Sequence, residues 1–503
     1  MFDFGNIFNA FGSVFQLSNL FAMLIGSIVG VIVGALPGAT ATMAIAIMIP
    51  ITFWFEPEFS LLLLISVYCS GVFGGSISAI LLNIPGTPAS AATCFDGHPL
   101  AMKGQGGKAI MVALVSSVIG GLVSGFALLF ASPALAALAL NFGAPESMMV
   151  AIFGLTMVAS LSSENLAKGF LMGLVGMFIG TIGLSPGGTA RFIFGNPNLY
   201  SGLAVVPLLI GVFSIPEVLT MITSKGWSKP EGHGGALKLS WAEFRSLWKT
   251  LGICTTIGLI IGLIPAIGPE TATFVGYDQA KRNSKNKDMF GKGAIEGVAA
   301  SESANNSVCG TSLAPMFALG IPGSGAAMVL MGALMIHGLM PGPQLFRENQ
   351  SLLMTLFLGF IVAQLFMLAS GYVAALFAPH ILNIHHLVLG PIILIVCMVG
   401  TFACNNNIFD VYVMLIAGVF SFFMGKAGYS PVPLVLGMIL GPMFEDELSR
   451  TLILASKDGF MPYMMGRPIA LLLFALTVFS IVAPIIVEQK KKRKLLKNSV
   501  DSN

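Results

Sequence analysis

The sequence predicts an all-α polytopic membrane protein. Its 503 residues are 55% hydrophobic and only 9% charged, whereas soluble domains carry roughly 25% charged residues. One crossing of a bilayer takes about 20 apolar residues, which leaves room for about 10–13 membrane segments. Several apolar stretches are also interrupted by Pro-Gly breaks beside polar residues. We therefore expect broken or re-entrant helices among the spans.

Basic residues are distributed unevenly along the chain. No Lys or Arg occurs before Lys103, whereas residues 490–494 read Lys-Lys-Lys-Arg-Lys. Basic segments beside spans stay in the cytoplasm. We therefore expect a multi-pass protein embedded in the lipid bilayer, with a cytoplasmic basic tail at residues 489–503. No nucleic-acid partner is expected, because a basic run directly after a span normally sets topology.

The longest polar stretch, residues 224–249, carries five basic residues. We interpret it as a cytoplasmic connector between an amino-terminal membrane repeat, residues 1–223, and a carboxy-terminal membrane repeat, residues 250–488. Within the first repeat, residues 1–19 space large apolar side chains as a helix does, which predicts a short interfacial helix.

The first repeat contains two interrupted segments. Residues 18–54 are broken at Pro37-Gly38 and form either two spans or a hairpin, because one helix of that length would be about 55 Å long. The next apolar run, residues 59–83, ends at a first tip that reads Asn83-Ile-Pro-Gly-Thr-Pro. Further spans are expected near residues 109–132, 146–161, 167–184 and 200–223.

The second repeat has the same order of elements. Residues 250–280 break around Pro265 and have basic residues on both sides, which predicts a re-entrant hairpin with its tip inside the membrane. Residues 294–343 then contain a second tip, Ile321-Pro-Gly-Ser-Gly, that matches the first. Later spans are expected near residues 351–378, 385–403, 408–425, 428–443 and 468–488.

Alternation of sides places the chain on opposite faces of the membrane after the two tips, so we expect the repeats to be inverted. Paired broken segments of this kind indicate the binding site of a secondary transporter. A half-helix that follows a Pro-Gly break offers free N–H groups and the positive end of its dipole, which suits an anion. Carboxamides bind a carboxylate through N–H or sodium through oxygen. The candidate substrate-binding residues are Asn83, Pro85, Gly86, Thr87, Ser90, Asn305, Asn306, Pro322, Gly323 and Ser324.

Coupling to an ion gradient needs a second set of polar groups. The four threonines after the hairpin tips either cap half-helices or bind ligand or ion. Among the acids, Glu302 is favoured over Asp278 and Glu296 because it lies one helical turn from Asn305 and Asn306. We expect sodium or a proton as coupling ion, with sodium a candidate at the hairpin tips. The ion-coupling candidates are Thr40, Thr42, Glu270, Thr271, Thr273 and Glu302.

Other charged and reactive residues receive weaker interpretations. His98 and His337 are isolated candidates for proton transfer, and Arg191 lies on the expected outer side, either at the interface or as an attractor of anions. Six remaining acids are interpreted as loop residues: Glu146, Glu164, Glu217, Glu445, Asp446 and Glu447. The sequence has no Walker A motif and no Cys/His cluster. We therefore expect no cofactor and no enzymatic activity, and the alternatives are an anion channel, a membrane scaffold or a membrane-embedded enzyme.

Three long stretches resemble a known family. They are residues 34–53 (GALPGATATMAIAIMIPITF), residues 74–107 and residues 290–346, which include FGKGAIEGVAASESANNSVCG. They resemble the large membrane (permease) subunit of tripartite tricarboxylate transporters. The resemblance implies ion-driven import of citrate-like tricarboxylates or related carboxylates. It also implies two protein partners, a small four-span membrane subunit and an extracytoplasmic solute-binding protein that delivers substrate.

Overall fold

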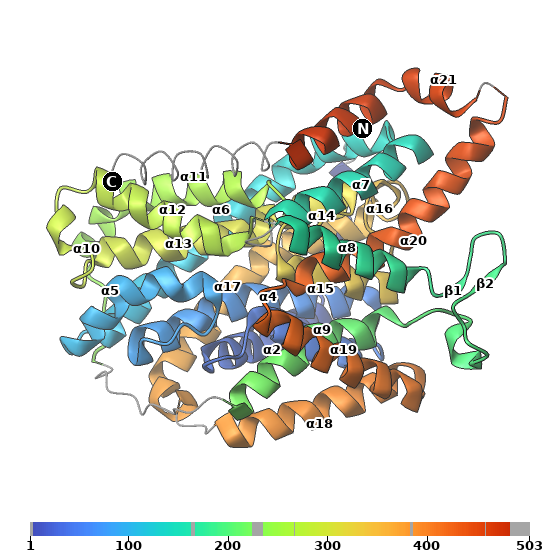
Figure 1. Ribbon diagram of the computed structural model, residues 1–503. Helices are drawn as coiled ribbons and strands as arrows, with labels where there is room; N and C mark the ends of the chain where they lie inside the picture. Colours follow the sequence, from blue (N-terminus) through green and yellow to red (C-terminus); the bar gives the residue numbers. More distant parts are fainter. Residues whose placement is uncertain are drawn as a thin grey trace, which may run out of the picture. The chain divides into compact units, whose positions relative to one another are not determined.

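A computed structural model describes residues 4–161, 166–223, 235–265, 267–382, 386–457 and 459–482. The described chain is helical apart from one two-stranded hairpin (Figure 1). Seven of the described helices are long and apolar enough to cross a membrane, which confirms the predicted all-α polytopic class. The chain forms two compact units, Met1–Leu140 with Val206–Phe422, and Asn141–Val205 with Phe423–Asn503. The predicted basic tail and residues 224–234 of the connector lie outside the described residues.

The first unit begins with a helix, a hairpin and a long helix. The amino-terminal helix exposes Phe8, Phe11 and Phe15, as an interfacial helix does. The interrupted stretch forms two helices with a turn at Leu36–Thr40, and its second helix is about 18 Å long, too short to cross a bilayer. The bounds are α1 Phe4–Val14, α2 Leu17–Ala35, α3 Ala41–Thr52 and α4 Pro57–Leu82.

Close packing of α2 on α4 depends on a stripe of glycines. A Cβ placed on Gly26, Gly30 or Gly34 would lie 2.3, 2.6 or 2.2 Å from a carbonyl oxygen of α4. Glycines spaced four residues apart form one face of a helix and allow two backbones to approach each other. The three glycines therefore set how closely α2 of the hairpin packs on α4, the helix that ends at the first tip.

We expect Gly30→Ala to lower the melting temperature of the purified protein by several degrees, because overpacking costs about 1–3 kcal/mol. The matched control is Gly252→Ala in α11 (Trp248–Gly262), where an added Cβ would meet nothing within 4 Å. That control should be neutral or stabilising by up to about 1 kcal/mol, since alanine favours helix over glycine. Equal melting temperatures for the two variants would contradict the packing argument.

The rest of the first unit follows the predicted order. The predicted spans near 109–132, 200–223, 351–378, 385–403 and 408–425 are helices, some of them longer than expected. The bounds are η1 Pro88–Ser90, α5 Ala91–Met102, α6 Gly106–Leu140, α9 Val205–Thr223, α10 Trp241–Ser246, α11 Trp248–Gly262, α12 Gly268–Asn283, η3 Lys287–Met289, α13 Ile295–Thr311, α14 Leu313–Leu319, α15 Gly325–Ile336, α16 Pro343–Glu348, α17 Gln350–Leu382, α18 His386–Asn405 and α19 Ile408–Lys426.

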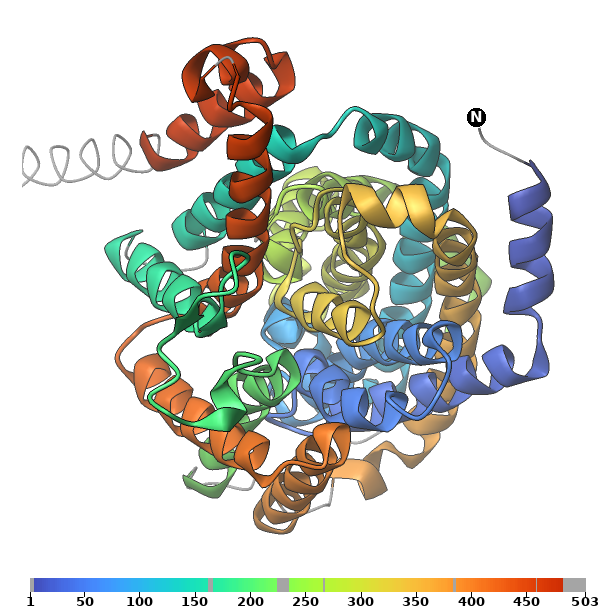
Figure 2. The same cartoon turned by 90° about the vertical axis from the view of Figure 1, so that its right-hand side faces the viewer.

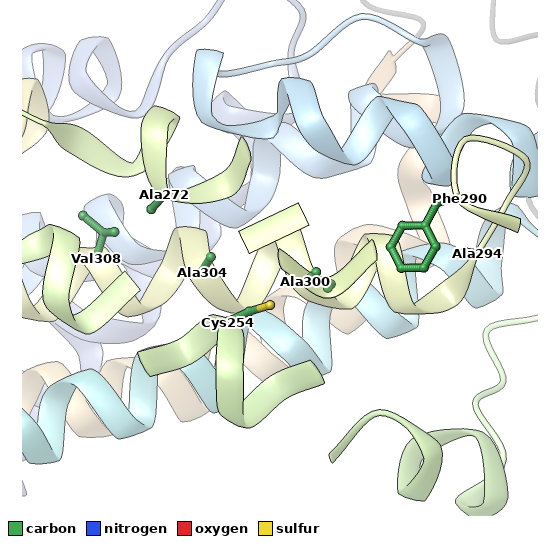
Figure 3. Close-up of a cluster of buried hydrophobic side chains, with 8 residues drawn as sticks. Cys254, Ala272, Phe290, Ala294, Ala300, Ala304 and Val308 are labelled. Atoms are coloured by element: carbon green, nitrogen blue, oxygen red, sulfur yellow. The ribbon is translucent and has the colours of Figure 1, made fainter. Parts of the chain in front are cut away.

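Small side chains also bring α11, α12 and α13 together. Cys254, Ala272 and Ala304 form a buried cluster where the three helices meet (Figure 3). Helices α11 and α12 have 15 and 16 residues, each shorter than one membrane crossing. These lengths agree with the predicted re-entrant hairpin.

Contacts between the two predicted repeats are crossed. Helix α3 of the first hairpin packs on α15 after the second tip, and α12 of the second hairpin packs on η1 and α5 after the first tip. Figure 2 shows α3 and α4 in blue beside the yellow α15. Helix α4 likewise packs on α17, and α13 packs on α6. Each contact has a counterpart when the repeats are exchanged, and the inverted repeat stays a prediction.

The second unit corrects several sequence-based expectations. Its helices are α7 Ala144–Leu161, α8 Leu166–Gly180, α20 Pro431–Leu454, α21 Phe460–Met465 and residues 468–482, and its strands are β1 Gly183–Leu184 and β2 Ala190–Arg191, followed by η2 Pro197–Leu199. The expectation that Glu445, Asp446 and Glu447 are loop residues is wrong, because α20 continues through them. Glu146 lies in the first turn of α7 and is buried. Glu217 of the first unit lies within α9, and Glu164 lies outside the described residues.

Arg191 is held by an acid rather than left to attract a ligand. Both terminal nitrogens of its guanidinium donate to Glu445, each at 2.8 Å. A bidentate pair of this kind fixes planar geometry and is stronger than a single contact. The pair fastens β2 to α20, so the sequence interpretation of Arg191 as an interfacial residue or anion attractor missed its partner.

The described part of the connector, residues 235–249, is anchored by an ion pair. Glu243 of α10 accepts a hydrogen bond from Lys108 at 2.8 Å and also caps the backbone N–H of Ser240. The Lys108 ammonium, together with Ser240, lowers the pKa of the Glu243 carboxyl to about 2. The pair ties the start of α6 to the segment that joins the predicted repeats.

Candidate functional site

The first tip is folded by the residues that the sequence marked. Asn83 ends α4 with φ of 57°, a left-handed conformation that asparagine tolerates better than most residues. The Gly86 N–H donates to the Gly75 carbonyl at 3.2 Å. A Cβ on Gly86 would lie 2.3 Å from the Gly34 carbonyl oxygen, so only glycine fits. Thr87 and Ser90 then form a capping box that starts the next half-helix.

The second tip is tied to α4 by a tyrosine. Ser324 caps α15 by accepting from the Ala327 N–H at 3.1 Å. The buried Tyr68 hydroxyl lies 3.1 Å from Ser324 Oγ and 3.2 Å from Ser312 Oγ. The Gly323 N–H donates to the Ser312 carbonyl at 3.3 Å. Pro322 and Gly323 are buried, and the sequence interpretation did not single out Tyr68 or Ser312.

The two tips lie against the same pair of helices rather than against each other. On α4, the first tip contacts Gly75 and the second contacts Tyr68, two helical turns or roughly 10 Å away. On α13, the groups after the first tip contact Glu302, whereas the second tip contacts Ser312 at the end of the helix. Asn305 and Asn306 therefore lie on α13 between the two tips.

Buried polar atoms without partners are concentrated in this part of the first unit. Within the described ranges, neither Asn305 Nδ2 nor Asn305 Oδ1 has a hydrogen-bond partner, and Asn306 Oδ1 has none. Asn306 Nδ2 makes only a long bond, 3.5 Å, to the Glu302 carbonyl. Ser70 of α4 and the side-chain oxygen of Gln364 on α17 also lack partners. Such groups cost free energy when buried unpaired, so a stable protein keeps them for a reason other than packing.

Glu302 lies at the centre of a group of hydroxyls. Thr93 Oγ1 of α5 and Ser117 Oγ of α6 donate to its two carboxylate oxygens, the second at 3.0 Å. Ser301 Oγ lies 3.1 Å from Thr93 Oγ1, and Ser76 of α4 faces the same carboxylate without a hydrogen bond of its own. All five side chains are fully buried. None of the ion pairs among the described residues involves Glu302.

A buried carboxylate whose hydrogen bonds come from two hydroxyls alone is a site for a proton or a cation. Two hydroxyl donors replace only part of the hydration that a full charge loses on burial. Carboxylate and hydroxyl oxygens are hard ligands that accept alkali and alkaline-earth cations. The sequence favoured Glu302, and its partners Thr93 and Ser117 could not be found from it because they lie on other helices.

Most of the other ion-coupling candidates bond to their own helices. Thr40 caps α3 by accepting from the Met43 N–H at 3.2 Å. Thr271 and Thr273 donate to the Ile267 and Glu270 carbonyls at 3.2 and 2.7 Å. Thr40 therefore matches the capping alternative that the sequence left open, whereas Thr271 and Thr273 bond to backbone carbonyls three or four residues earlier and do not cap α12.

Thr42 and Glu270 are placed differently. Thr42 lies beside the start of α15, with its Oγ1 3.6 Å from the position of a Cβ on Gly325. The exposed Glu270 bends back over Gly268 at the start of α12, where a carboxylate is stabilised by the helix dipole. Thr42 is therefore the hairpin threonine that the structure brings to a tip.

The weaker candidates are bonded away from Asn305 and Glu302. His98 Nδ1 lies 3.1 Å from the Ile80 carbonyl, and His337 Nε2 lies 3.5 Å from Thr52 Oγ1. Asp278 pairs with Arg282 on the surface, and Glu296 accepts a hydrogen bond from Ser284. These acids and histidines are therefore not part of the buried polar cluster.

Comparison with known proteins identifies the family of the chain. Residues 20–436 match the family described as the tripartite tricarboxylate transporter TctA family. One relative, the "Uncharacterized 52.8 kDa protein in TAR-I ttuC' 3'region" of Agrobacterium vitis, is 34% identical over 90% of both chains. A second from the same organism, the "Uncharacterized protein in TAR-II ttuC' 3'region", is 32% identical over 47% of this chain and 97% of its own length. No solved structure matches. The family match confirms the resemblance seen in the sequence, and the chain belongs to the tripartite tricarboxylate transporter TctA family.

Proposed function

We propose that the chain is the large permease subunit of a tripartite secondary transporter that imports tricarboxylates or related carboxylates and is driven by an ion gradient. The observation that carries this proposal is the proximity of two groups on α13. Among the described residues, Glu302 is a buried carboxylate that no basic side chain pairs with, and Asn305, one helical turn later, is a buried amide without a hydrogen-bond partner. A symporter needs this combination, because its ion site and substrate site must influence each other.

Substrate binds between the two tips in this proposal. The amide N–H groups of Asn305 and Asn306, the Ser70 hydroxyl and the half-helix that begins at Ser324 all suit carboxylate oxygens. The unpaired amide oxygens suit the hydroxyl or the protonated carboxyl of a citrate-like acid. A bound carboxylate would satisfy the orphaned donors, which supports a substrate role over simple helix packing.

The ion site is Glu302 with its hydroxyls. An empty site leaves a negative charge near the incoming anion. At a separation of ~7 Å and an effective dielectric constant of ~20, two like charges repel by about 2 kcal/mol, or about 30-fold in affinity. Sodium or a proton on Glu302 removes this repulsion, so the ion and the carboxylate bind together. The bundle of α4, α6, α13 and α17 is the scaffold against which the hairpins and tips move, and their crossed contacts support inverted repeats.

Membership of the family supports a proposal for the partners and the location of the protein. Its name describes a tripartite system, and we propose that a small membrane subunit and an extracytoplasmic solute-binding protein complete this one. The protein lies in the bacterial cytoplasmic membrane with its carboxy terminus in the cytoplasm. The basic residues at 490–494 support that orientation.

Uptake into proteoliposomes tests the proposal. The chain and its small partner are reconstituted, the binding protein is added outside with radiolabelled citrate, and a sodium or proton gradient is imposed. We expect accumulation above the external concentration under one gradient, which names the ion. Accumulation of another di- or tricarboxylate changes the substrate and keeps the mechanism. Equilibration without accumulation would identify a channel, and no movement of any carboxylate by folded protein would overturn the proposal.

A further inference from the structure

Asp96 of α5 is a second fully buried carboxylate, outside the group around Glu302. Its Oδ1 accepts hydrogen bonds from the backbone N–H groups of Gly291, Gly293 and Ala294, each at 2.8 Å. Its Oδ2 accepts one from the Tyr277 hydroxyl, also at 2.8 Å. One side chain therefore joins the half-helix after the first tip to α12 and to the start of α13.

These bonds replace a cap that α13 lacks. The residue before α13, Ala294, has no side chain that caps the helix, so the carboxylate that faces its positive end comes from α5. Gly291 and Gly293 have φ of 82° and 102°, conformations that turn their N–H groups toward one acceptor and that other residues rarely adopt. The loop is thus shaped around this carboxylate.

The Asp96 carboxylate also fits because residue 297 is a glycine. A Cβ on Gly297, in the first turn of α13, would lie 2.1 Å from Asp96 Oδ2 and 2.9 Å from the Tyr277 ring. The Tyr277 ring packs edge-on against Phe95 and Phe290. Helices α5, α12 and α13 therefore meet around Asp96, and their packing leaves room for its carboxylate in one position.

The tip and α5 segment is flanked by two residues with left-handed backbone conformations. Asn83 before the tip and Gly104 after α5 have positive φ, and an added Cβ on Gly104 would meet nothing within 4 Å. Gly291 is exposed, so water can take over its N–H group when the carboxylate leaves. The Asp96 bonds therefore join α5 to α12 and to the loop before α13, and one of their four donors is exposed.

We propose that Asp96 is a gate latch that holds α5 and the first tip against α12 and α13, and that the latch opens and closes in each transport cycle. The need for this movement rests on the proposed transport function. The residue is a positioning residue: it touches neither Asn305 nor the hydroxyls around Glu302, and it acts by holding Thr93, on the same helix, at the Glu302 carboxylate.

The protein contains its own reporter of the latch. Cys94 lies two residues before Asp96 and is partly exposed, whereas the other five cysteines are buried. Opening of α5 should therefore raise the rate at which N-ethylmaleimide modifies Cys94. Cys94→Ser measures the background from the other cysteines.

The experiment compares modification rates in the full-length purified protein. We expect Asp96→Ala to raise the Cys94 rate about tenfold, and Tyr277→Phe and Gly297→Ala to raise it about threefold, because each removes or displaces part of the latch. The matched control is Asp278→Asn, next to Tyr277 but paired with Arg282 on the surface, which should leave the rate unchanged. Folded Tyr277→Phe and Gly297→Ala proteins with the wild-type rate would overturn the latch, even where Asp96→Ala does not fold.

Transport kinetics separate a latch from a purely structural role. In proteoliposomes we expect Asp96→Ala to lower the maximal uptake rate about tenfold and Tyr277→Phe to lower it about threefold. In both variants the half-saturating substrate concentration should change by less than about twofold. A structural role would reduce the amount of folded protein and leave the rate per folded molecule unchanged. The rate of Cys94 modification can be measured whether or not the protein transports carboxylates. If the wild-type protein moves no carboxylate, the transport proposal is refuted. The modification rates of the variants still decide whether Asp96 holds α5 in place.

Discussion

Replacement of Glu302 by glutamine is expected to lower gradient-driven accumulation of carboxylate about 30-fold, the factor that corresponds to a coupling of about 2 kcal/mol. Glutamine keeps the shape of the side chain. Its amide oxygen can accept from one of the two hydroxyls, Thr93 or Ser117, and its NH2 group can donate to the other. It cannot, however, gain and lose a cation or a proton. Exchange of labelled for unlabelled substrate across the membrane needs no net ion movement, so it should continue.

The measurement is uptake and exchange in the same proteoliposomes, with Glu296→Gln as control. Glu296 lies two helical turns earlier on α13, and its partner is Ser284 rather than the buried cluster. We expect it to transport at the wild-type level. Unchanged accumulation in Glu302→Gln would show that the coupling ion binds elsewhere.

Replacement of Asn305 by leucine is expected to weaken transport and to stabilise the protein. Both polar ends of this buried amide lack partners among the described residues, and such a group costs about 1–3 kcal/mol. Leucine has a similar volume and removes that cost, so the melting temperature should rise by a few degrees. A lost hydrogen bond to a charged substrate should raise the half-saturating concentration about 10–100-fold.

Asn19→Leu is the matched control. Asn19 is also buried, but its amide donates to the Ser13 carbonyl at 2.9 Å, so its replacement should lower the melting temperature and leave the half-saturating concentration unchanged. A destabilised Asn305→Leu protein with normal transport would show that Asn305 only packs helices. The triple replacement of Asn305, Asn306 and Ser324 extends the test, because wild-type uptake by that folded protein would refute the whole site.

Local chemistry explains which elements were predictable. Pro85, Gly86 and Asn83 break a helix through their own backbone preferences, so the first tip lies where the sequence placed it. The same holds for the turn at Pro37-Gly38 and for the second tip. Spans were found from runs of apolar residues, which need no knowledge of their neighbours.

Long-range pairs account for the misses. Arg191 and Glu445 are 254 residues apart in the sequence, and each taken alone looks like an interfacial or loop residue. Asp96 stands in Asp96-Gly-His-Pro, a string that usually indicates a turn, yet it lies inside α5 and binds a loop 195 to 198 residues later. No local pattern reports such a partner.

The sequence by itself determined that this is a polytopic α-helical membrane protein, where its helices break, and that Glu302 and Asn305 lie one turn apart. These features depend on composition, backbone preference and helical periodicity, which act over a few residues. Only the tertiary structure decided what surrounds them: Thr93 and Ser117 reach Glu302 from 209 and 185 residues away, and the Asn305 amide has no hydrogen-bond partner in the part of the chain that the structure describes. Burial and hydrogen bonding of a side chain depend on which helices pack around it, and that packing is a property of the whole fold.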